Sequence, residues 1–355
     1  MDTVGVTREE PQLLIDRPGS IGHIRLNRSK ALNSLTLEMV RGIEAALDAF
    51  EYDPDVAAVL VTGEGERGLC AGGDIRAIYA SVRAGTNAAQ TFWREEYFLN
   101  ARISHFSKPY VVIMDGITMG GGVGISAHGS HRIVTERTRL AMPETGIGFF
   151  PDIGATWLLS RGEGEFGTFL GLSGEQIGAT EIISAGLADF YVPRERLSGL
   201  VEALCAIDAN ASREQVSRTI ERFKEPTQAS PLEQHRALID RAFAFDTVEE
   251  ILVALQSDGC DFARRTVDAL KAKSPTSLKV SLRLLRFGRA SVSLDECLAR
   301  EFAAIAAVLS SADFFEGIRA AVIDKDRNPQ WSPPTLAAVG EASISRHFPP
   351  HEPLL

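Results

Sequence analysis

Two glycine-rich turns have the residue types needed to stabilise negative charge that develops on a carbonyl oxygen. Residues 70–74 read CAGGD and residues 119–122 read MGGG, and a helical pattern follows each. Glycine allows close approach of the backbone, so peptide N–H groups from two separate turns can converge on one oxyanion. Glycines often serve only tight turns. Two such turns in this order, followed by Glu144 in residues 141–144 (AMPE), instead favour an oxyanion site near a carboxylate.

The same region superficially fits the glycine fingerprint of dinucleotide-binding proteins. Residues 63–68 (GEGERG) and 122–127 (GVGISA) have the required spacing. The first segment runs into another glycine turn, so no helix N-terminus is available to hold a pyrophosphate. The second is not followed by a strand that ends in an acidic residue about 20 positions later. Binding of a nicotinamide cofactor is therefore not expected.

Residues 124–128 (GISAH) come close to the nucleophile elbow of serine hydrolases. His128 replaces the second glycine that lets the elbow turn, which argues against a serine triad. His128 and His131 could face one way on a helix as metal ligands, but the sequence offers no convincing third ligand. We therefore predict no metal site.

The elements that must position these turns alternate between strand and helix. Alternating apolar and polar residues at 13–17 and 21–27, around a Pro-Gly-Ser turn, predict a β-hairpin. An apolar spacing of about 3.6 residues and short apolar runs predict helices at 36–50, 74–82 and 89–103, strands at 57–62, 110–114 and 132–135, and a helix after residue 120. This alternation is typical of an α/β fold.

After about residue 200 the strand pattern fades and the chain reads as helices. Residues 274–277 (SPTS), for example, resemble a capped helix start. We therefore divide the chain into a core at 1–200 and a helical region at 201–355.

Composition limits the classes of protein to consider. With 355 residues and 45% hydrophobic content, the chain can bury a large core. The four cysteines form no CxxC pair, which favours a reducing cytoplasm. The first twenty residues mix charges with prolines, unlike a signal peptide, and no apolar run reaches membrane-spanning length. A net charge of −10 argues against nucleic acid as a partner.

Long ordered motifs in this chain resemble the crotonase (enoyl-CoA hydratase/isomerase) superfamily, and more closely its 3-hydroxyisobutyryl-CoA hydrolase branch. They are 27–35 (NRSKALNSL), 70–75 (CAGGDI), 115–124 (DGITMGGGVG) and 142–152 (MPETGIGFFPD). The tail at 315–320 (FEGIRA) with 324–326 (DKD) also resembles that branch. The likeness covers nearly the whole chain.

The resemblance implies a spiral of ββα units at 1–200, carrying the CoA and catalytic site. The helical region at 201–355 would then cover the site or mediate assembly. Coenzyme A would enter as part of an acyl-CoA substrate, with no permanently bound cofactor. Members of the superfamily assemble, so a homo-oligomer is implied, whether a dimer, a trimer or a hexamer.

The resemblance also implies site residues. The N–H groups of Gly73 and Gly121 would form the oxyanion hole. Lys30 would lie against the CoA nucleotide, with main-chain contacts around Ala31 and Ala71 guiding the ligand.

Hydratases of this superfamily use two glutamates, and the position of the first reads Gly124 here. Glycine cannot transfer a side-chain proton, so the hydrolase branch is the better match. The expected reaction is hydrolysis of 3-hydroxyisobutyryl-CoA, in valine catabolism. Glu144 would be nucleophile or general base, Asp152 would orient it or the water, and Glu96 would contact the substrate hydroxyl.

Alternatives stay open at this point. An enoyl-CoA hydratase or isomerase could use Glu144 alone, and a CoA-binding protein could lack chemistry altogether. Glu96 could be an exposed helix residue, and Asp152 could be a helix N-cap. An apolar acyl chamber is expected from Phe92, Phe98, Ile117, Phe149 and Phe150.

Overall fold

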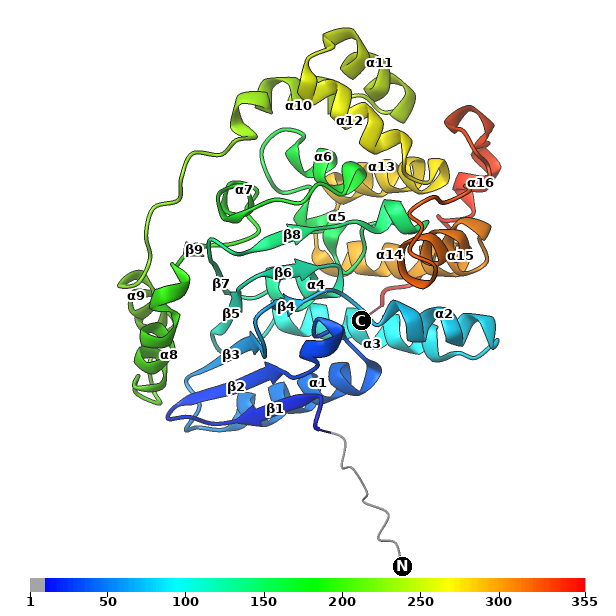
Figure 1. The fold of residues 1–355 in the computed structure, drawn as a ribbon. Helices are drawn as coiled ribbons and strands as arrows, with labels where there is room; N and C mark the ends of the chain where they lie inside the picture. The colour runs from blue at the N-terminus through cyan, green and yellow to red at the C-terminus, as the bar shows by residue number, and fades with distance from the viewer. Residues whose placement is uncertain (1–9, 355) are drawn as a thin grey trace, which may run out of the picture.

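The computed structural model describes residues 10–354. The expectation for the first twenty residues therefore falls partly on residues 1–9, which lie outside the described part. A six-stranded sheet forms the centre of the first half (Figure 1). Its order is β1 (Leu13–Asp16), β2 (Ile21–Leu26), β3 (Ala58–Gly63), β5 (Tyr110–Met114), β7 (His131–Val134) and β9 (Phe190–Tyr191). Only β1 and β2 are antiparallel, which confirms the predicted hairpin.

A second, smaller sheet was not predicted from the sequence. Its three parallel strands are β4 (Gly68–Cys70), β6 (Ile117–Met119) and β8 (Arg139–Ala141). Strands of three residues are too short to show a period-two pattern, and β4 lies in a segment that read as a glycine turn. This sheet leads directly to the residues with candidate chemistry.

The helices of the first half lie close to their predicted positions. They are α1 (Leu37–Tyr52), α2 (Ile75–Arg83), α3 (Ala88–Ser104) and α4 (Gly121–Ala127). The Thr36 side chain caps α1 by accepting a hydrogen bond from the Met39 N–H. The alternation of strands and helices confirms the predicted α/β class.

Beyond β9 the described chain contains helices and loops but no strand. The helices after α4 are α5 (Ala155–Leu158), α6 (Phe166–Ser173), α7 (Ala179–Ser184), α8 (Leu197–Cys205), α9 (Arg213–Glu221), α10 (Arg236–Phe243), α11 (Val248–Asp258), α12 (Asp261–Lys271), α13 (Pro275–Ala290), α14 (Leu294–Leu309), α15 (Ala312–Ile318) and α16 (Glu341–Ser345). Ser274 caps α13, as its sequence indicated.

Helices α8 and α9 cover one face of the large sheet (Figure 1). Leu200 and Val216, from α8 and α9, pack against sheet residues such as Leu60. Helices α13 and α14 instead share a continuous core with α3 and α5. The domain division at residue 200 stays a prediction. Within residues 10–354, no helix is both long and apolar enough to cross a membrane.

Candidate active site

The three strands of the small sheet end at the same place. Because β4, β6 and β8 are parallel, their carboxyl ends lie along one edge, where ligands of α/β proteins commonly bind. Residues 71–73, 120–121 and 143–144 follow these ends and line a cavity of about 220 Å³. Helix α3 supplies another wall, through Phe92, Trp93 and Glu96. The small sheet and one helix therefore bring together residues that are far apart in the sequence.

The two glycine turns approach each other closely at this cavity. A Cβ at Gly121 would lie 3.3 Å from the Gly73 nitrogen. In the part of the chain that the structure describes, neither of these two N–H groups donates a hydrogen bond. Gly72 has φ of +107° and Gly120 has φ of +48°, conformations that side chains strongly disfavour. The turns can therefore serve as an oxyanion hole, as their sequence indicated.

Glu96 points from α3 toward the second turn. Its side chain is 2% exposed, and its Oε1 would lie 2.3 Å from a Cβ at Gly121. That oxygen has no hydrogen-bond partner among the described residues. The neighbouring Glu95 is the surface residue, paired with Arg41 at 2.6 Å. The reading of Glu96 as an exposed helix residue is therefore wrong.

Glu144 and Asp152 complete the acidic side of the cavity. Glu144 is 6% exposed, and a Cβ at Gly120 would lie 3.2 Å from its Oε1. Its Oε2 has no hydrogen-bond partner among the described residues. Asp152 is also buried, and its Oδ2 accepts a 2.7 Å hydrogen bond from the Tyr97 hydroxyl. The alternative of Asp152 as an N-cap is wrong, because Gly154 takes that position before α5.

Burial raises the pKa of all three carboxyl groups. The pKa of Glu96 lies well above its usual range, because burial and the charges of Asp152 and Glu144 oppose ionisation. Burial and the charge of Asp152 likewise raise the pKa of Glu144, against the opposing charge of Lys273. Burial raises the pKa of Asp152 to about 7, against the hydrogen bond from Tyr97. The surroundings of this cavity therefore oppose ionisation of all three carboxyl groups.

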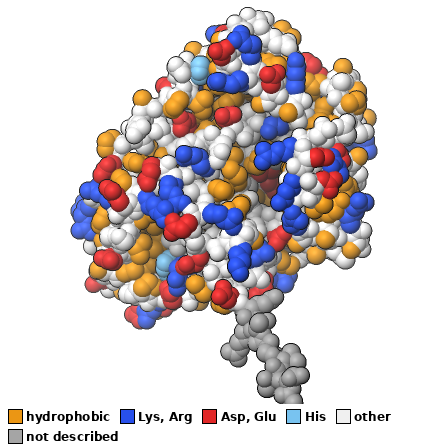
Figure 2. Space-filling view, viewed as in Figure 1, with side chains coloured by type: hydrophobic (Ala, Val, Ile, Leu, Met, Phe, Trp, Pro, Cys, Tyr) orange, Lys and Arg blue, Asp and Glu red, His pale blue; other side chains and the backbone are white. Residues whose placement is uncertain are grey.

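The predicted contacts to the CoA nucleotide lie at the edge of this arrangement. Ala71 lines the cavity, and its N–H donates to the Leu32 carbonyl at 3.0 Å. Lys30 and Ala31 lie on an exposed single turn just before Leu32, outside the cavity lining. Figure 2 shows Lys and Arg side chains gathered around a hollow near the ends of the small sheet. A basic rim suits an anionic ligand despite the negative net charge.

The apolar lining differs in part from the expectation. Phe92 and Phe149 line the cavity, but Phe98 is 36% exposed because it lies on the opposite face of α3. Ile117 lies within β6, and Phe150 borders a separate small cavity. The remaining apolar lining comes from Ile75, Ile78, Trp93, Ile147, Ile153 and Val322. Ile75 and Ile78 lie three residues apart in α2, a spacing that places both on one face of a helix. No local sequence pattern indicates that Val322 lies at this site.

Gly124, where the resemblance places the first glutamate of the hydratases, is closely packed by side chains. A Cβ there would lie 2.8 Å from Asn100 Nδ2 and 3.1 Å from Ile153 Cβ. A larger side chain would displace buried neighbours. His128 and His131, the pair considered above as metal ligands, contact different groups. His128 contacts the Ile153 carbonyl, and His131 contacts the Ser217 hydroxyl.

Comparison with known proteins shows the family to which this chain belongs. Residues 21–348 match the family described as enoyl-CoA hydratase/isomerase. The mitochondrial 3-hydroxyisobutyryl-CoA hydrolase of Danio rerio is 41% identical, over 95% of this chain and 89% of that protein. The human protein of the same name is also 41% identical, over 95% of this chain and 88% of its own length.

Two solved structures are also similar over almost their full length. One is a carnitinyl-CoA dehydratase from Mycobacterium thermoresistibile, with a TM-score of 0.91 and 43% identity, covering 96% of this chain and 97% of that one. The other is an enoyl-CoA hydratase from Rhodobacter sphaeroides, with a TM-score of 0.88 and 38% identity, covering 96% of this chain and 98% of that one. The two animal proteins are thus named as hydrolases, whereas the two solved structures are named as a dehydratase and a hydratase.

Proposed function

Because the chain belongs to the enoyl-CoA hydratase/isomerase family, and within it to the 3-hydroxyisobutyryl-CoA hydrolase branch, we propose that it hydrolyses the thioester of a small 3-hydroxyacyl-CoA. The substrate that we propose is 3-hydroxyisobutyryl-CoA, which yields 3-hydroxyisobutyrate and CoA. One observation carries the choice of reaction. Glu144 lies beside the two glycine turns in the cavity, while Gly124 stands where a hydratase of this family would have its first glutamate.

Hydrolysis of a thioester needs a base or nucleophile, stabilisation of the oxyanion and a proton for the leaving thiolate. Attack on the thioester carbon moves an electron pair onto the carbonyl oxygen, where the N–H groups of Gly73 and Gly121 stabilise it. Collapse of this intermediate breaks the C–S bond, and the departing thiolate takes up a proton that comes from the hydrolytic water, either through Glu144 as base or when water hydrolyses the anhydride formed by direct attack. Glu144 either accepts the proton of the attacking water or attacks first and is then released by water. Its raised pKa makes the ionised carboxylate a stronger base.

The other two acids have separate roles in this proposal. Asp152, held by Tyr97, orients Glu144 or the hydrolytic water. Glu96 keeps its proton because of its raised pKa, and it contacts the hydroxyl of the substrate. A buried group placed for that hydroxyl discriminates strongly against acyl groups that lack it.

Substrate binding follows the shape and charge of the site. Phe92, Phe149 and Ile153 give the acyl group a small apolar chamber. Coenzyme A is part of the substrate, with Ala71 and Ala31 guiding it and Lys30 near its nucleotide. No permanently bound cofactor is proposed.

The pathway, the cellular location and the partners of the protein are also proposals. We place the reaction in valine catabolism and the protein in the cytoplasm, where its four free cysteines stay reduced. The animal relatives carry the word mitochondrial in their names, which describes those proteins. A homo-oligomer is proposed, and neither nucleic acid nor a membrane is proposed as a partner.

The second candidate is hydration of an enoyl-CoA with Glu144 as the sole acid and base. The names of the two similar solved structures favour it, since one is called a hydratase and the other a dehydratase. The two reactions differ in what they release. Hydrolysis frees a thiol, whereas hydration removes the conjugated double bond and leaves the thioester intact.

The test follows both signals with one enzyme preparation. Free thiol is measured with a thiol-reactive dye on 3-hydroxyisobutyryl-CoA, and enoyl absorbance is followed on crotonyl-CoA. We expect thiol release by the wild type, its loss in Glu144→Gln, and no change in enoyl absorbance. Loss of the enoyl signal without thiol release would establish the hydratase instead. Tight binding of CoA with neither signal would indicate a protein without chemistry.

A further inference from the structure

The turn that carries Asp152 is strained and is held from two sides. Ile153 has φ of +59° and Gly154 has φ of +78°. A β-branched residue at positive φ is rare and persists only where its surroundings enforce it. Ile153 itself lines the cavity, directly after Asp152. The groups that enforce this turn therefore also decide where the Asp152 carboxyl group points.

Glu301, from α14 in the helical region, holds the far end of the turn. Its side chain is fully buried, and its Oε2 accepts a 2.7 Å hydrogen bond from the Gly154 N–H. Its Oε1 accepts from the N–H of Thr156 at 3.0 Å and from the Thr156 hydroxyl at 2.5 Å. One carboxyl group thus fixes two backbone amides within three residues. The proposed chemistry gives Glu301 no other task.

His128 holds the near end of the same turn. It follows α4, the helix that begins at Gly121, and its Nε2–H donates to the Ile153 carbonyl at 2.7 Å. Burial lowers its pKa to about 4, so the ring is neutral near pH 7 and donates through Nε2. A Cβ at Gly154 would lie 2.9 Å from this ring, which shows how closely the two pack.

We propose that Glu301 and His128 are positioning residues, which lock the turn at Ile153 and Gly154 so that Asp152 stays against Tyr97 and faces the cavity. Neither residue lines the cavity. Through this turn, α14 and α4 both determine the position of the Asp152 side chain. The inference rests on the proposed hydrolysis only for its kinetic test.

The experiment compares Glu301→Gln, His128→Ala and His128→Gln with the wild type. Gln at 301 keeps the shape but cannot accept hydrogen bonds from both backbone amides, because its amide nitrogen is a donor. Gln at 128 can still donate to the Ile153 carbonyl. Misplacement of a catalytic group by a fraction of an ångström lowers the turnover rate, not the substrate affinity. We expect kcat to fall roughly 10–100-fold in Glu301→Gln and His128→Ala, KM to stay within about twofold, and His128→Gln to recover most of the loss.

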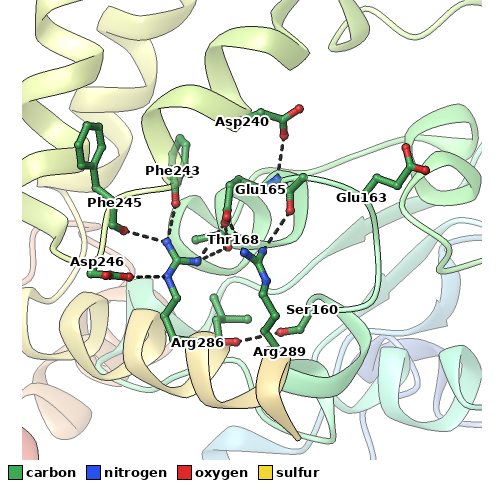
Figure 3. Close-up of polar contacts among 12 residues, drawn as sticks. Ser160, Glu163, Glu165, Thr168, Asp240, Phe243, Phe245, Asp246, Arg286 and Arg289 are labelled. Atoms are coloured by element: carbon green, nitrogen blue, oxygen red, sulfur yellow. Dashed lines mark hydrogen bonds and ion pairs between the residues drawn. The ribbon is translucent and has the colours of Figure 1, made fainter.

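A matched control comes from Glu165, another buried carboxylate. It is bound by Arg286 and Arg289, away from the cavity (Figure 3). Glu165→Gln should lose stability and keep kcat, which separates positioning from general destabilisation. All rates are measured per folded molecule, below the unfolding transition of each variant. If Glu301→Gln does not fold, Thr156→Val removes only the hydroxyl contact, and it decides the question together with His128→Ala.

The outcomes are separable from those of the proposed function. Unchanged kcat in both disrupting variants would overturn the positioning role. If the wild type itself releases no thiol, the hydrolase proposal fails, and crystal structures of the variants decide the positioning role alone. The contact between the Tyr97 hydroxyl and Asp152 Oδ2, 2.7 Å in the wild type, should break. Its persistence in Glu301→Gln and His128→Ala would reject the inference.

Discussion

Two regions of this molecule bury carboxylates in opposite ways. At the start of α6, Glu165 is 7% exposed and is bound by two arginines of α13, Arg286 at 3.0 Å and Arg289 at 2.6 Å (Figure 3). Thr168 donates a third hydrogen bond to it, at 2.6 Å. In the cavity, Glu96, Glu144 and Asp152 are buried to a similar degree, but no arginine pairs with them in the described chain. The residue types are alike and the surroundings differ.

The pKa values follow the surroundings. Burial raises the pKa of Glu165, but the hydrogen bonds from Arg289 and Thr168 and the charge of Arg286 outweigh it, so the net pKa is lowered. Burial raises the pKa of the three cavity acids, and the charge of Asp152 adds to the effect at Glu96 and Glu144. The Glu165 cluster stabilises the junction of α6, α13 and the loop after α10. The cavity instead holds groups at a cost in stability, as sites that transfer protons commonly do.

The largest expected effect is on catalysis at Glu144. Glu144→Gln should lower kcat for thiol release by about 10³-fold, because the amide can neither act as base nor attack. Its midpoint in thermal unfolding should be equal to or above that of the wild type, because a repelling buried charge is removed. A lower midpoint together with retained activity would mean that Glu144, like Glu165, stabilises the fold and does not act in catalysis.

The contributions of the two regions to the free energy of unfolding should change with pH in opposite directions, by about a few kcal/mol. Asp152 has a folded pKa of about 7, raised from 3.8, so its favourable contribution is complete below about pH 4 and is lost as the pH rises through 7. Asp152→Asn should therefore gain stability relative to the wild type between about pH 5 and pH 8, by roughly 2–4 kcal/mol. Urea unfolding at several pH values measures this difference. A constant difference would mean that Asp152 is not perturbed.

Glu165→Gln should show the reverse signature. Its loss leaves two arginines with fewer partners, and unfolding in urea should become easier by about 1–3 kcal/mol, since Arg289 is partly exposed. Because its folded pKa is lowered, the stabilisation is present above the unfolded pKa and disappears as the pH falls below it. Its kcat should stay within about twofold of the wild type. A large loss of kcat would instead couple this cluster to the cavity.

The smallest effect is expected at Glu96, in substrate preference. A protonated glutamic acid resembles glutamine, so Glu96→Gln should change kcat/KM for 3-hydroxyisobutyryl-CoA by no more than about threefold. Glu96→Leu should lower the preference for this substrate over isobutyryl-CoA by about tenfold, because the contact to the hydroxyl is lost. Equal preference in wild type and Glu96→Leu would remove Glu96 from substrate recognition.

Much of the local structure was predictable because it depends on neighbours in the sequence. The hairpin, the strand at Tyr110–Met114 and the helices around residues 36–52 and 88–104 follow apolar spacing and caps such as Thr36. The family resemblance selected Glu144, Asp152, Gly73, Gly121 and Glu96, and the structure brings all five to one cavity. Their catalytic and binding roles stay predictions for the kinetic tests.

The sequence by itself determined the strands of the large sheet, the helices and the positions of the two glycine turns, because periodicity and glycine conformation act over a few residues. Only the tertiary structure decided that three very short strands place these turns at one edge, since their pairing joins Gly68 to Ile117 and Ile117 to Arg139. It alone brought Tyr97 and Glu301 to Asp152 and its turn, and two arginines to Glu165. Whether a buried acid stabilises the fold or holds a proton depends on which distant charges reach it, and this is set by packing between elements.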